Sequence, residues 1–206
     1  MEDILHMDIS AGIVLFNPDI KRLKENIDAV IIQCTHLYLV DNGSGNVDEV
    51  KGLLNQYNQS KISILWNREN QGIAKALNQL TSAAQKEGFD WILTLDQDSV
   101  VPSNIVGEFE KYINNSSVGI LCPIICDRNK GEEIKINEDC TEIDECITSG
   151  SLLNIKAWSE IGGFDERMFI DGVDFDICYR LRQRGYKIYC IHSVVLLHEL
   201  GHIEYH

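Results

Sequence analysis

The chain has 206 residues, of which 44% are hydrophobic, which suits a single domain with a buried core. Its formal net charge is −14, from 32 acidic and 18 basic residues, and this field argues against nucleic acid as a partner because it repels a phosphate backbone. The N-terminal MEDILHMDIS lacks the features of a signal peptide, and no apolar run approaches the roughly 18 residues of a membrane span.

The first half of the chain alternates short apolar stretches with helical periodicity. Strands are predicted over residues 9–16, 37–40, 62–66, 91–95 and 118–122. Apolar residues at helical spacing predict helices over 21–31, 47–57, 73–84 and 102–112. Strands separated by helices indicate an α/β fold, with a mostly parallel central sheet covered by helices on both faces.

The second half differs in composition. Residues 127–146 are polar and strongly acidic, which predicts an insertion or a flap. Helices are then expected over 155–161 and 174–184, and a strand over the β-branched residues of 186–197.

The seven cysteines do not form a disulfide pattern, because their number is odd and their spacing is irregular. Cys122 and Cys126 are spaced like a metal-binding pair, but no second pair follows at zinc-finger spacing. We therefore expect reduced, mostly buried thiols in a cytoplasmic protein.

The segment VDNGSG follows the second predicted strand. Its GSG is half of a dinucleotide-binding fingerprint, and Asp48 stands where the third glycine would be, so the fingerprint fails. Asp41 then has two interpretations. It binds a ligand at the carboxyl end of a parallel strand, or it caps a tight turn, and this segment alone favours the turn.

The segment LTLDQDS ends the fourth predicted strand. If the strand continues, Asp96 and Asp98 point to one side and Gln97 to the other. Two carboxylates at the mouth of a buried strand require a cation, and oxygen ligands favour Mg²⁺ or Mn²⁺ over zinc. The alternative is that both acids are solvated in a loop.

The segment IDGVDFDICYR carries further acidic residues. Asp176 and Arg180 lie one helical turn apart, which predicts a structural ion pair. Asp171 and Asp174 have no basic residue near them in sequence, so one of them is a candidate proton acceptor.

The sequence HELGH, residues 198–202, matches the H-E-x-x-H signature of zinc proteases. That motif requires a helix, whereas the preceding residues favour a strand and Gly201 disfavours a helix. The zinc protease hypothesis is therefore the weaker one. His198 is either a metal ligand of another kind of site or a structural histidine.

Several stretches together resemble one family, namely GIVLFNPD, LVDNGS, NRENQGIAKALNQ, LTLDQDS, TSGSLL, GGFDERMFIDGVDFDICYRLRQRGY and His198. Their order and spacing, from residue 12 to 198, are similar to those of inverting family 2 glycosyltransferases, most of all the rhamnosyltransferase branch. The resemblance implies the Rossmann-like GT-A fold in one domain, 1–206. A nucleotide-sugar-binding half would cover about 8–125 and a smaller acceptor-side half about 126–206, and further C-terminal helices found in relatives would be missing.

The resemblance implies donor contacts for residues of the first half. Asp41 would contact the nucleotide base and Asp96 would lie near the ribose. Three residues of the NRENQGIAKALNQ segment match positions near the nucleotide: Asn70, Gly72 and Asn78.

The resemblance also implies the catalytic groups. Asp98 would bind a Mg²⁺ or Mn²⁺ ion that bridges the diphosphate, and His198 matches a histidine that joins this metal. Asp174 matches the general base. Val173 replaces the glutamate usual in the family, which leaves the handling of the acceptor open, and Asp171 is a possible substitute.

The function implied is metal-dependent transfer of a sugar, with inversion, from a nucleotide-diphosphate-sugar. The donor indicated is dTDP-rhamnose, and the acceptor is a saccharide or a lipid-linked molecule in cell-surface polysaccharide synthesis. Peripheral association with the inner face of the membrane is compatible with such an acceptor. The alternative function is that of a catalytically weak nucleotide-sugar-binding module or an enzyme fragment.

Overall fold

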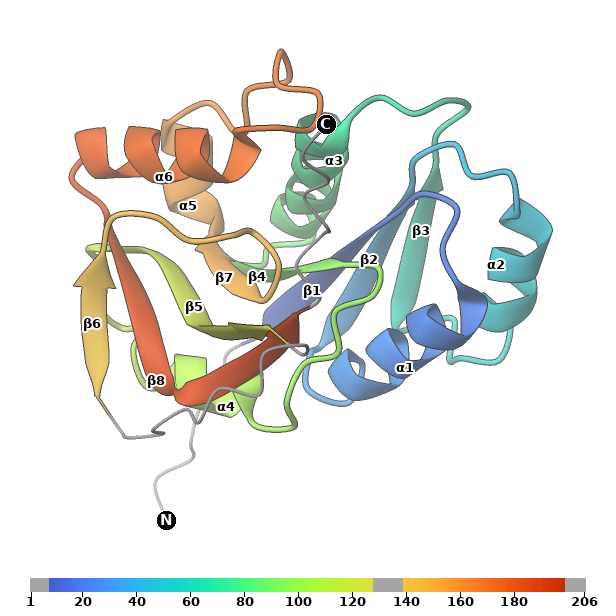
Figure 1. The fold of residues 1–206 in the computed structure, drawn as a ribbon, viewed down its shortest axis with the longest axis horizontal. Helices are drawn as coiled ribbons and strands as arrows, with labels where there is room; N and C mark the ends of the chain where they lie inside the picture. Colours follow the sequence, from blue (N-terminus) through green and yellow to red (C-terminus); the bar gives the residue numbers. More distant parts are fainter. Residues whose placement is uncertain (1–7, 128–138, 199–206) are drawn as a thin grey trace.

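Eight strands form one sheet in the order β3-β2-β1-β4-β7-β5-β8-β6 in the computed structural model, which describes residues 8–127 and 139–198 (Figure 1). The strands are β1 (Ile9–Leu15), β2 (His36–Asp41), β3 (Ile62–Trp66), β4 (Trp91–Asp96), β5 (Val118–Asp127), β6 (Cys140–Ile143), β7 (Ser151–Asn154) and β8 (Lys187–His198). Pairing is parallel among β3, β2, β1 and β4, and again between β5 and β8. The predicted α/β fold with a mostly parallel sheet is confirmed.

The antiparallel strand β7 was not predicted. It pairs with both β4 and β5 and so joins the two parallel parts of the sheet. Its sequence, SLLN, is too short to show the alternation by which a strand is recognised. The other antiparallel strand, β6, pairs with β8 and lies inside the segment predicted as a flap.

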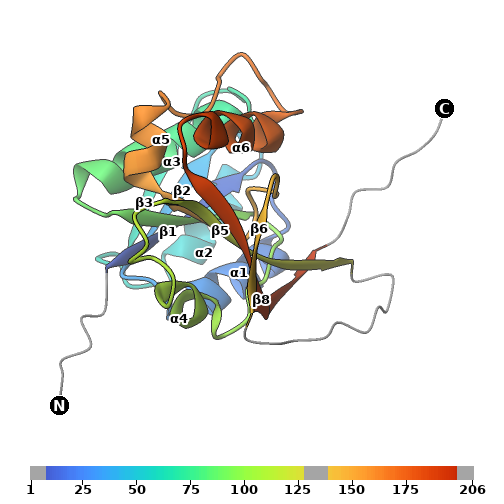
Figure 2. The same cartoon turned by 90° about the vertical axis from the view of Figure 1, so that its left-hand side faces the viewer.

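Helices cover both faces of the sheet (Figure 2). The helices are α1 (Ile20–Val30), α2 (Val47–Leu54), α3 (Ile73–Lys86), α4 (Ile105–Glu110), α5 (Ile155–Glu160) and α6 (Val173–Gln183). One hydrophobic cluster packs α1, α2 and α4 on one face, and a second packs α3, α5 and α6 on the other. Among the described helices, none has the length and the apolar character needed to cross a bilayer.

Three element boundaries differ from the prediction by three residues or more. Helix α2 ends at Leu54 instead of residue 57. Helix α4 begins only at Ile105, because a separate turn precedes it. In that turn the Pro102 carbonyl accepts hydrogen bonds from the Ile105 N–H and from the side chain of Gln33. Strand β5 continues to Asp127 because, after a register shift, it pairs with the second half of β8.

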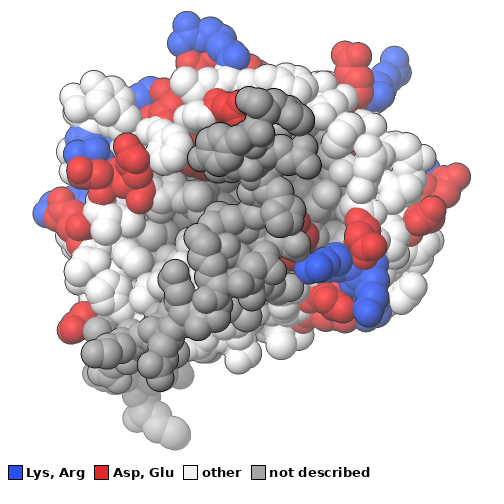
Figure 3. Space-filling view, viewed as in Figure 1, with Lys and Arg blue, Asp and Glu red and all other residues white. Residues whose placement is uncertain are grey.

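Charged groups on the face shown in Figure 3 lie mainly near the rim, where acidic and basic side chains are neighbours. Some of the ion pairs of the described residues lie one helical turn apart in sequence and are half exposed, such as Lys24 with Asp28 at 2.5 Å. Exposed pairs of this kind stabilise the fold by less than about 1 kcal/mol. The buried clusters therefore supply most of the stability.

Replacing Ile92 by alanine tests this assignment of the core. Ile92 is fully buried in the middle strand β4, so its loss should lower the free energy of unfolding by about 2–5 kcal/mol. The matched control is Ile32→Ala, because Ile32 is 76% exposed and its loss should change stability by less than about 0.5 kcal/mol. Equal midpoints for the two variants in urea unfolding would contradict the assignment.

Candidate functional site

A cleft of about 370 Å³ lies at the carboxyl ends of β1 and β4. The loop after β2, the starts of α3 and α6, and residues 147–149 and 169–170 complete its walls. Among the described residues that line it there are two carboxylates, Asp96 and Asp174, and no lysine, arginine or histidine. The predicted donor residues Asn70 and Gly72 line it as well. Residues far apart in sequence therefore converge as expected at the edge where parallel strands end.

Asp96 is the last residue of β4, so the condition that the strand continues to Asp98 is not met. The chain turns instead, and the Ser99 N–H donates to the Asp96 carbonyl at 3.3 Å. The side chain of Gln97 reaches the end of β1, where its Oε1 accepts from the Phe16 N–H at 2.8 Å. Asp98 is exposed on this turn and is not among the residues that line the cleft. The prediction that Asp96 and Asp98 share one side of an extended strand was wrong.

Asp174 lies in the first turn of α6 and faces the cleft. Its Oδ1 accepts from the Thr148 N–H at 3.1 Å. Gly172, at φ 78°, allows the sharp entry of the chain into α6, and Asp171 just before it is exposed and outside the cleft lining.

The predicted structural pair in α6 is present. The Arg180 Nε donates to Asp176 Oδ2 at 2.7 Å, and Arg180 Nη1 donates to the carbonyl of Ile161. This pair fastens α6 to the end of α5.

Asp41 is fully buried at the end of β2 and does not line the cleft. Its Oδ1 accepts from the N–H groups of Gly43 and Ser44, at 3.1 and 2.9 Å, so Asp41 does cap the turn after β2. Its Oδ2 is buried and has no hydrogen-bond partner among the described residues. A buried acceptor without a partner costs about 1–3 kcal/mol, which makes this oxygen a candidate contact for a ligand N–H.

Asn42, which sequence reasoning missed, organises the loop before α3. Its Nδ2 donates to Asn70 Oδ1 at 2.9 Å and to the Gly72 carbonyl at 3.2 Å. Its Oδ1 accepts from the Gln71 N–H at 3.0 Å and from Asn67 Nδ2 at 3.1 Å. The sequence showed an asparagine beside Asp41, but nothing in it showed that the partners lie in the NRENQG segment.

Gly72 brings a second loop against the start of α3. Its φ is +85°, and a Cβ there would lie 2.7 Å from the Phe169 carbonyl oxygen. The same carbonyl accepts from the Ile73 N–H at 2.7 Å. A side chain at position 72 would displace the loop of residues 163–172, which carries two residues of the cleft wall, Phe169 and Ile170.

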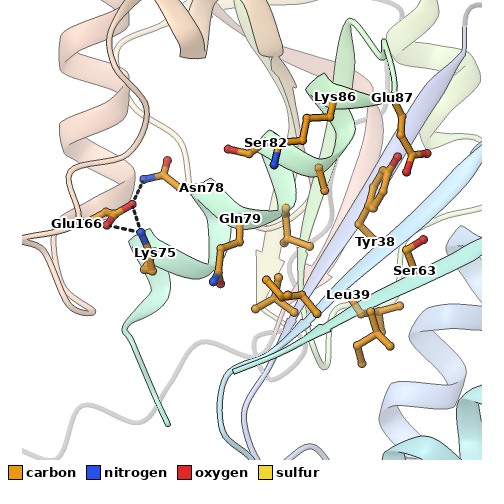
Figure 4. A pocket seen from close by; sticks show the side chains of 15 residues that line it. Tyr38, Leu39, Ser63, Lys75, Asn78, Gln79, Ser82, Lys86, Glu87 and Glu166 are labelled. Carbon is orange, nitrogen blue, oxygen red and sulfur yellow. Dashed lines mark hydrogen bonds and ion pairs between the residues drawn. The ribbon is translucent and has the colours of Figure 1, made fainter. Parts of the chain in front are cut away.

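Asn78 lies away from the cleft, beside a second cavity of about 440 Å³ between α3 and the strands β2 and β3 (Figure 4). Its Nδ2 donates to the Phe164 carbonyl and to Glu166, and its Oδ1 accepts from the Phe164 N–H and Trp158 Nε1. Glu166 also accepts from Lys75 at 2.9 Å, as Figure 4 shows. Through these contacts Asn78, which lies on α3, holds the 163–172 loop against that helix.

His198 is the last residue of β8, with its Cα opposite that of Asp127. Its side chain, like residues 199–202 of the HELGH segment, lies outside the described part of the chain. A strand through His198 disagrees with the helix that a zinc protease motif requires. Within residues 8–127 and 139–198, no three metal-binding side chains of histidine, cysteine, aspartate or glutamate form a cluster.

The cysteines are all free thiols, in agreement with the prediction. The Sγ atoms of Cys146 and Cys178 lie 3.8 Å apart. A hydrogen bond between the two thiols and burial raise the pKa of the Cys178 thiol, so it is uncharged at neutral pH.

The ion pair on the 163–172 loop leads to a pH prediction. The hydrogen bond from Lys75 holds the pKa of Glu166 below its usual value of 4.5, so the pair stabilises the protein above that pH and the effect is lost as pH falls through the lowered pKa. In Lys75→Met, the free energy of unfolding should be lower than in wild type by less than about 1 kcal/mol at pH 7, because the pair is half exposed. The difference should shrink as pH falls below about 4.5 and should be absent once Glu166 is protonated in the folded protein. A difference independent of pH in thermal unfolding would contradict this origin.

Several known glycosyltransferases are similar to this chain. A dTDP-rhamnosyl transferase, RfbF of Shigella flexneri, is 27% identical over 215 residues, which cover 96% of this chain and 71% of that protein. The fold matches GalNAc-T7 bound to UDP, GalNAc and Mn²⁺, with a TM-score of 0.76 and 17% identity over 96% of this chain and 45% of that one.

Two further solved structures have the same fold. One is the mannosyltransferase PcManGT of Pyrobaculum calidifontis with GDP-Man and Mn²⁺, with a TM-score of 0.74 and 16% identity over 96% of this chain and 58% of that one. The other is S. aureus TarS with UDP, with a TM-score of 0.67 and 13% identity over 95% of this chain and 61% of that one. The chain thus spans about half the length of the solved structures it matches.

The fold of these neighbours is the GT-A fold, as the sequence predicted. The family model described as Glycosyl transferase family 2 matches residues 10–178, a stretch that includes every cleft-lining segment. The predicted class of enzyme is confirmed at the level of the family, and the chain belongs to glycosyl transferase family 2.

Proposed function

We propose that the chain is a metal-dependent inverting glycosyltransferase that moves L-rhamnose from dTDP-rhamnose to a hydroxyl group of a saccharide or lipid-linked acceptor in cell-surface polysaccharide synthesis. The observation that carries this proposal is the charge of the cleft, whose described lining has two carboxylates and no basic side chain. A diphosphate would be repelled there unless a divalent cation accompanied it. The name of the RfbF relative supports the choice of donor.

The residues at the end of β4 fit a hard divalent cation. Mg²⁺ and ions like it are commonly held by one or two carboxylates together with substrate phosphates, so one acid on the exposed turn after β4 is a sufficient carboxylate contribution. Asp98 is proposed as the ligand, with Asp96 near the ribose and His198 as a further ligand. When bound, the ion offsets the negative charge that builds up on the departing diphosphate.

The donor is proposed to lie across the loop after β2 and the start of α3. Asn70 and Gly72 face the cleft, and their positions are held by Asn42. Asp41 is proposed to accept a hydrogen bond from the nucleotide base through Oδ2, the buried oxygen without a partner among the described residues. Because Asp41 is fully buried, this contact requires the turn at Gly43 and Ser44 to move on binding. Asn78 is proposed to act indirectly, by holding the 163–172 loop.

Asp174 is proposed as the general base. It takes the proton of the acceptor hydroxyl as the oxygen attacks the anomeric carbon, and the bond from that carbon to the diphosphate breaks with inversion. Val173, which stands in place of the usual glutamate, is 4% exposed and packs in the core. Asp174 is therefore the acidic residue of this helix turn whose side chain faces the cleft. Asp171 is the second candidate, on the exposed loop just before α6.

The two halves of the domain are proposed to divide the substrates. Residues of about 8–125 would hold the donor and those of about 126–206 the acceptor, since Asp96 and Asn70 meet Asp174 across the same cleft. We place the enzyme at the cytoplasmic face of the membrane, where a nucleotide-sugar and a lipid-linked acceptor would meet.

Asp174→Asn tests the base. Transfer of rhamnose should fall on the order of 10²–10⁴-fold because the amide cannot accept the proton, while the Kd for dTDP stays close to that of wild type. The transfer rate is measured as release of dTDP from dTDP-rhamnose in the presence of an acceptor molecule. The Kd for dTDP is measured by calorimetry. Asp171→Asn is the control and should retain activity. If Asp171→Asn is inactive and Asp174→Asn active, the two roles are reversed.

Asp98→Asn tests the metal ligand. Wild type should bind dTDP at least ten times more tightly with Mn²⁺ than with EDTA, and the substitution should remove most of this difference because a neutral amide is a poor ligand for a hard cation. Asp48→Asn changes the charge equally at a fully exposed site on α2 and should leave the difference intact. Unchanged Mn²⁺ dependence in Asp98→Asn would exclude Asp98 as the ligand.

A further inference from the structure

A serine in the wall of the cleft contacts both ends of the turn that carries Asp98. The Ser149 hydroxyl accepts from the Asp96 N–H at 3.1 Å and donates to Ser99 Oγ at 2.8 Å. The turn is closed by the Ser99 N–H, which donates to the Asp96 carbonyl. Ser149 is 2% exposed and Ser99 is 1% exposed, so these hydrogen bonds are shielded from water. Loss of a hydrogen-bond partner is costly for a group that water cannot reach.

The residue before this serine contacts the proposed base. The Thr148 N–H donates to Asp174 Oδ1 at 3.1 Å. Consecutive residues of one loop therefore hold two different parts of the site. Thr148 holds Asp174 on α6, and Ser149 holds the Asp96–Ser99 turn after β4.

The loop that carries these two residues is itself fixed to β4. The Thr148 carbonyl accepts from Thr94 Oγ1 at 2.7 Å, and the Gly150 N–H donates to the Thr94 carbonyl at 2.8 Å. Gly150 has φ +79°, and a Cβ there would lie 2.6 Å from a methyl carbon of Leu196 on β8. The loop therefore has little freedom to move relative to the two strands beside it.

We propose that Ser149 is a positioning residue, which sets the Asp98 turn at a fixed place relative to Asp174. This inference rests on the proposed function, because it gives the turn a role in holding a metal-bound diphosphate. Without the hydroxyl, the Asp96 N–H and the Ser99 side chain lose a shared partner, and the turn can shift. A displacement of about 1 Å between reacting groups is enough to cost on the order of 100-fold in rate.

The test is Ser149→Ala, measured by calorimetry of dTDP with Mn²⁺ and with EDTA. The Kd with Mn²⁺ should rise about tenfold or more, and the Kd with EDTA should stay within about twofold of wild type, because the turn acts through the metal. Ser99→Ala keeps the hydrogen bond from the Asp96 N–H to Ser149 and should have a smaller effect of the same kind.

The matched control is Ser10→Ala. Ser10 is fully buried and donates to the Trp91 carbonyl at 2.9 Å, at the opposite end of β4. It should lower the thermal unfolding midpoint about as much as Ser149→Ala while leaving the Mn²⁺ dependence of binding unchanged.

Three results would overturn this inference while leaving the proposed function intact. The first is an equal effect of Ser149→Ala and Ser10→Ala on Mn²⁺-dependent binding, and the second is an equal loss with Mn²⁺ and EDTA. The third applies if the Ser149→Ala variant does not fold. In that case, Mn²⁺-dependent binding of dTDP that is unchanged in Ser99→Ala would overturn the inference. Wild type that binds dTDP equally well with and without Mn²⁺ would overturn the proposed function, and this inference with it.

Discussion

Parallel, in-register pairing of β1, β2 and β4 determines where this site can form. Leu15 pairs with Asp41, and Val14 pairs with Asp96, so the strands end at one level and the polar residues that follow them gather at one edge of the sheet. The backbone carbonyl and N–H groups beyond the last pair need new partners. Side chains supply them. Gln97 binds the backbone of Phe16, and the Asn26 side chain donates to the Asp96 carbonyl at 2.7 Å.

The cleft depends equally on a loop from the second half of the chain. Residues 163–172 are held on α3 by Asn78 and Glu166 at one end and by contact of Phe169 with Gly72 at the other. The same loop leads directly into α6, which begins with Val173 and Asp174. Packing against α3 therefore determines the place of the proposed base, although α3 itself supplies few groups to the cleft.

Long periodic segments were predictable from sequence, whereas short ones and cross-chain contacts were not. Helices α1, α3 and α6 and strands β1 to β4 follow patterns that are visible locally, since each helix has one apolar face and the strands are short, mainly apolar runs. Strand β7 has only four residues, and its pairing partners β4 and β5 lie far from it in sequence.

The candidate site shows the same limit. The acids Asp96 and Asp174 were recognised because a carboxylate at a strand end or a helix start has a local signature. The turn at Asp98 was predicted incorrectly because the Gln97 side chain binds the distant Phe16 backbone. Asn42 and Ser149 were missed for a related reason, since their partners are residues or N–H groups from other parts of the chain.

The position of β7 between β4 and β5 has a consequence for synthesis on the ribosome. A nascent chain that has emerged as far as α4 already contains β1 to β4 and their covering helices, which pair with one another. It lacks Thr148, Ser149 and Asp174, and one edge of β4 has no neighbour until β7 is made. The growing polypeptide therefore contains the proposed donor contacts Asn70 and Asp96 before it contains the proposed base Asp174, and the unpaired edge of β4 is a place where a ribosome-bound intermediate is open to wrong pairing.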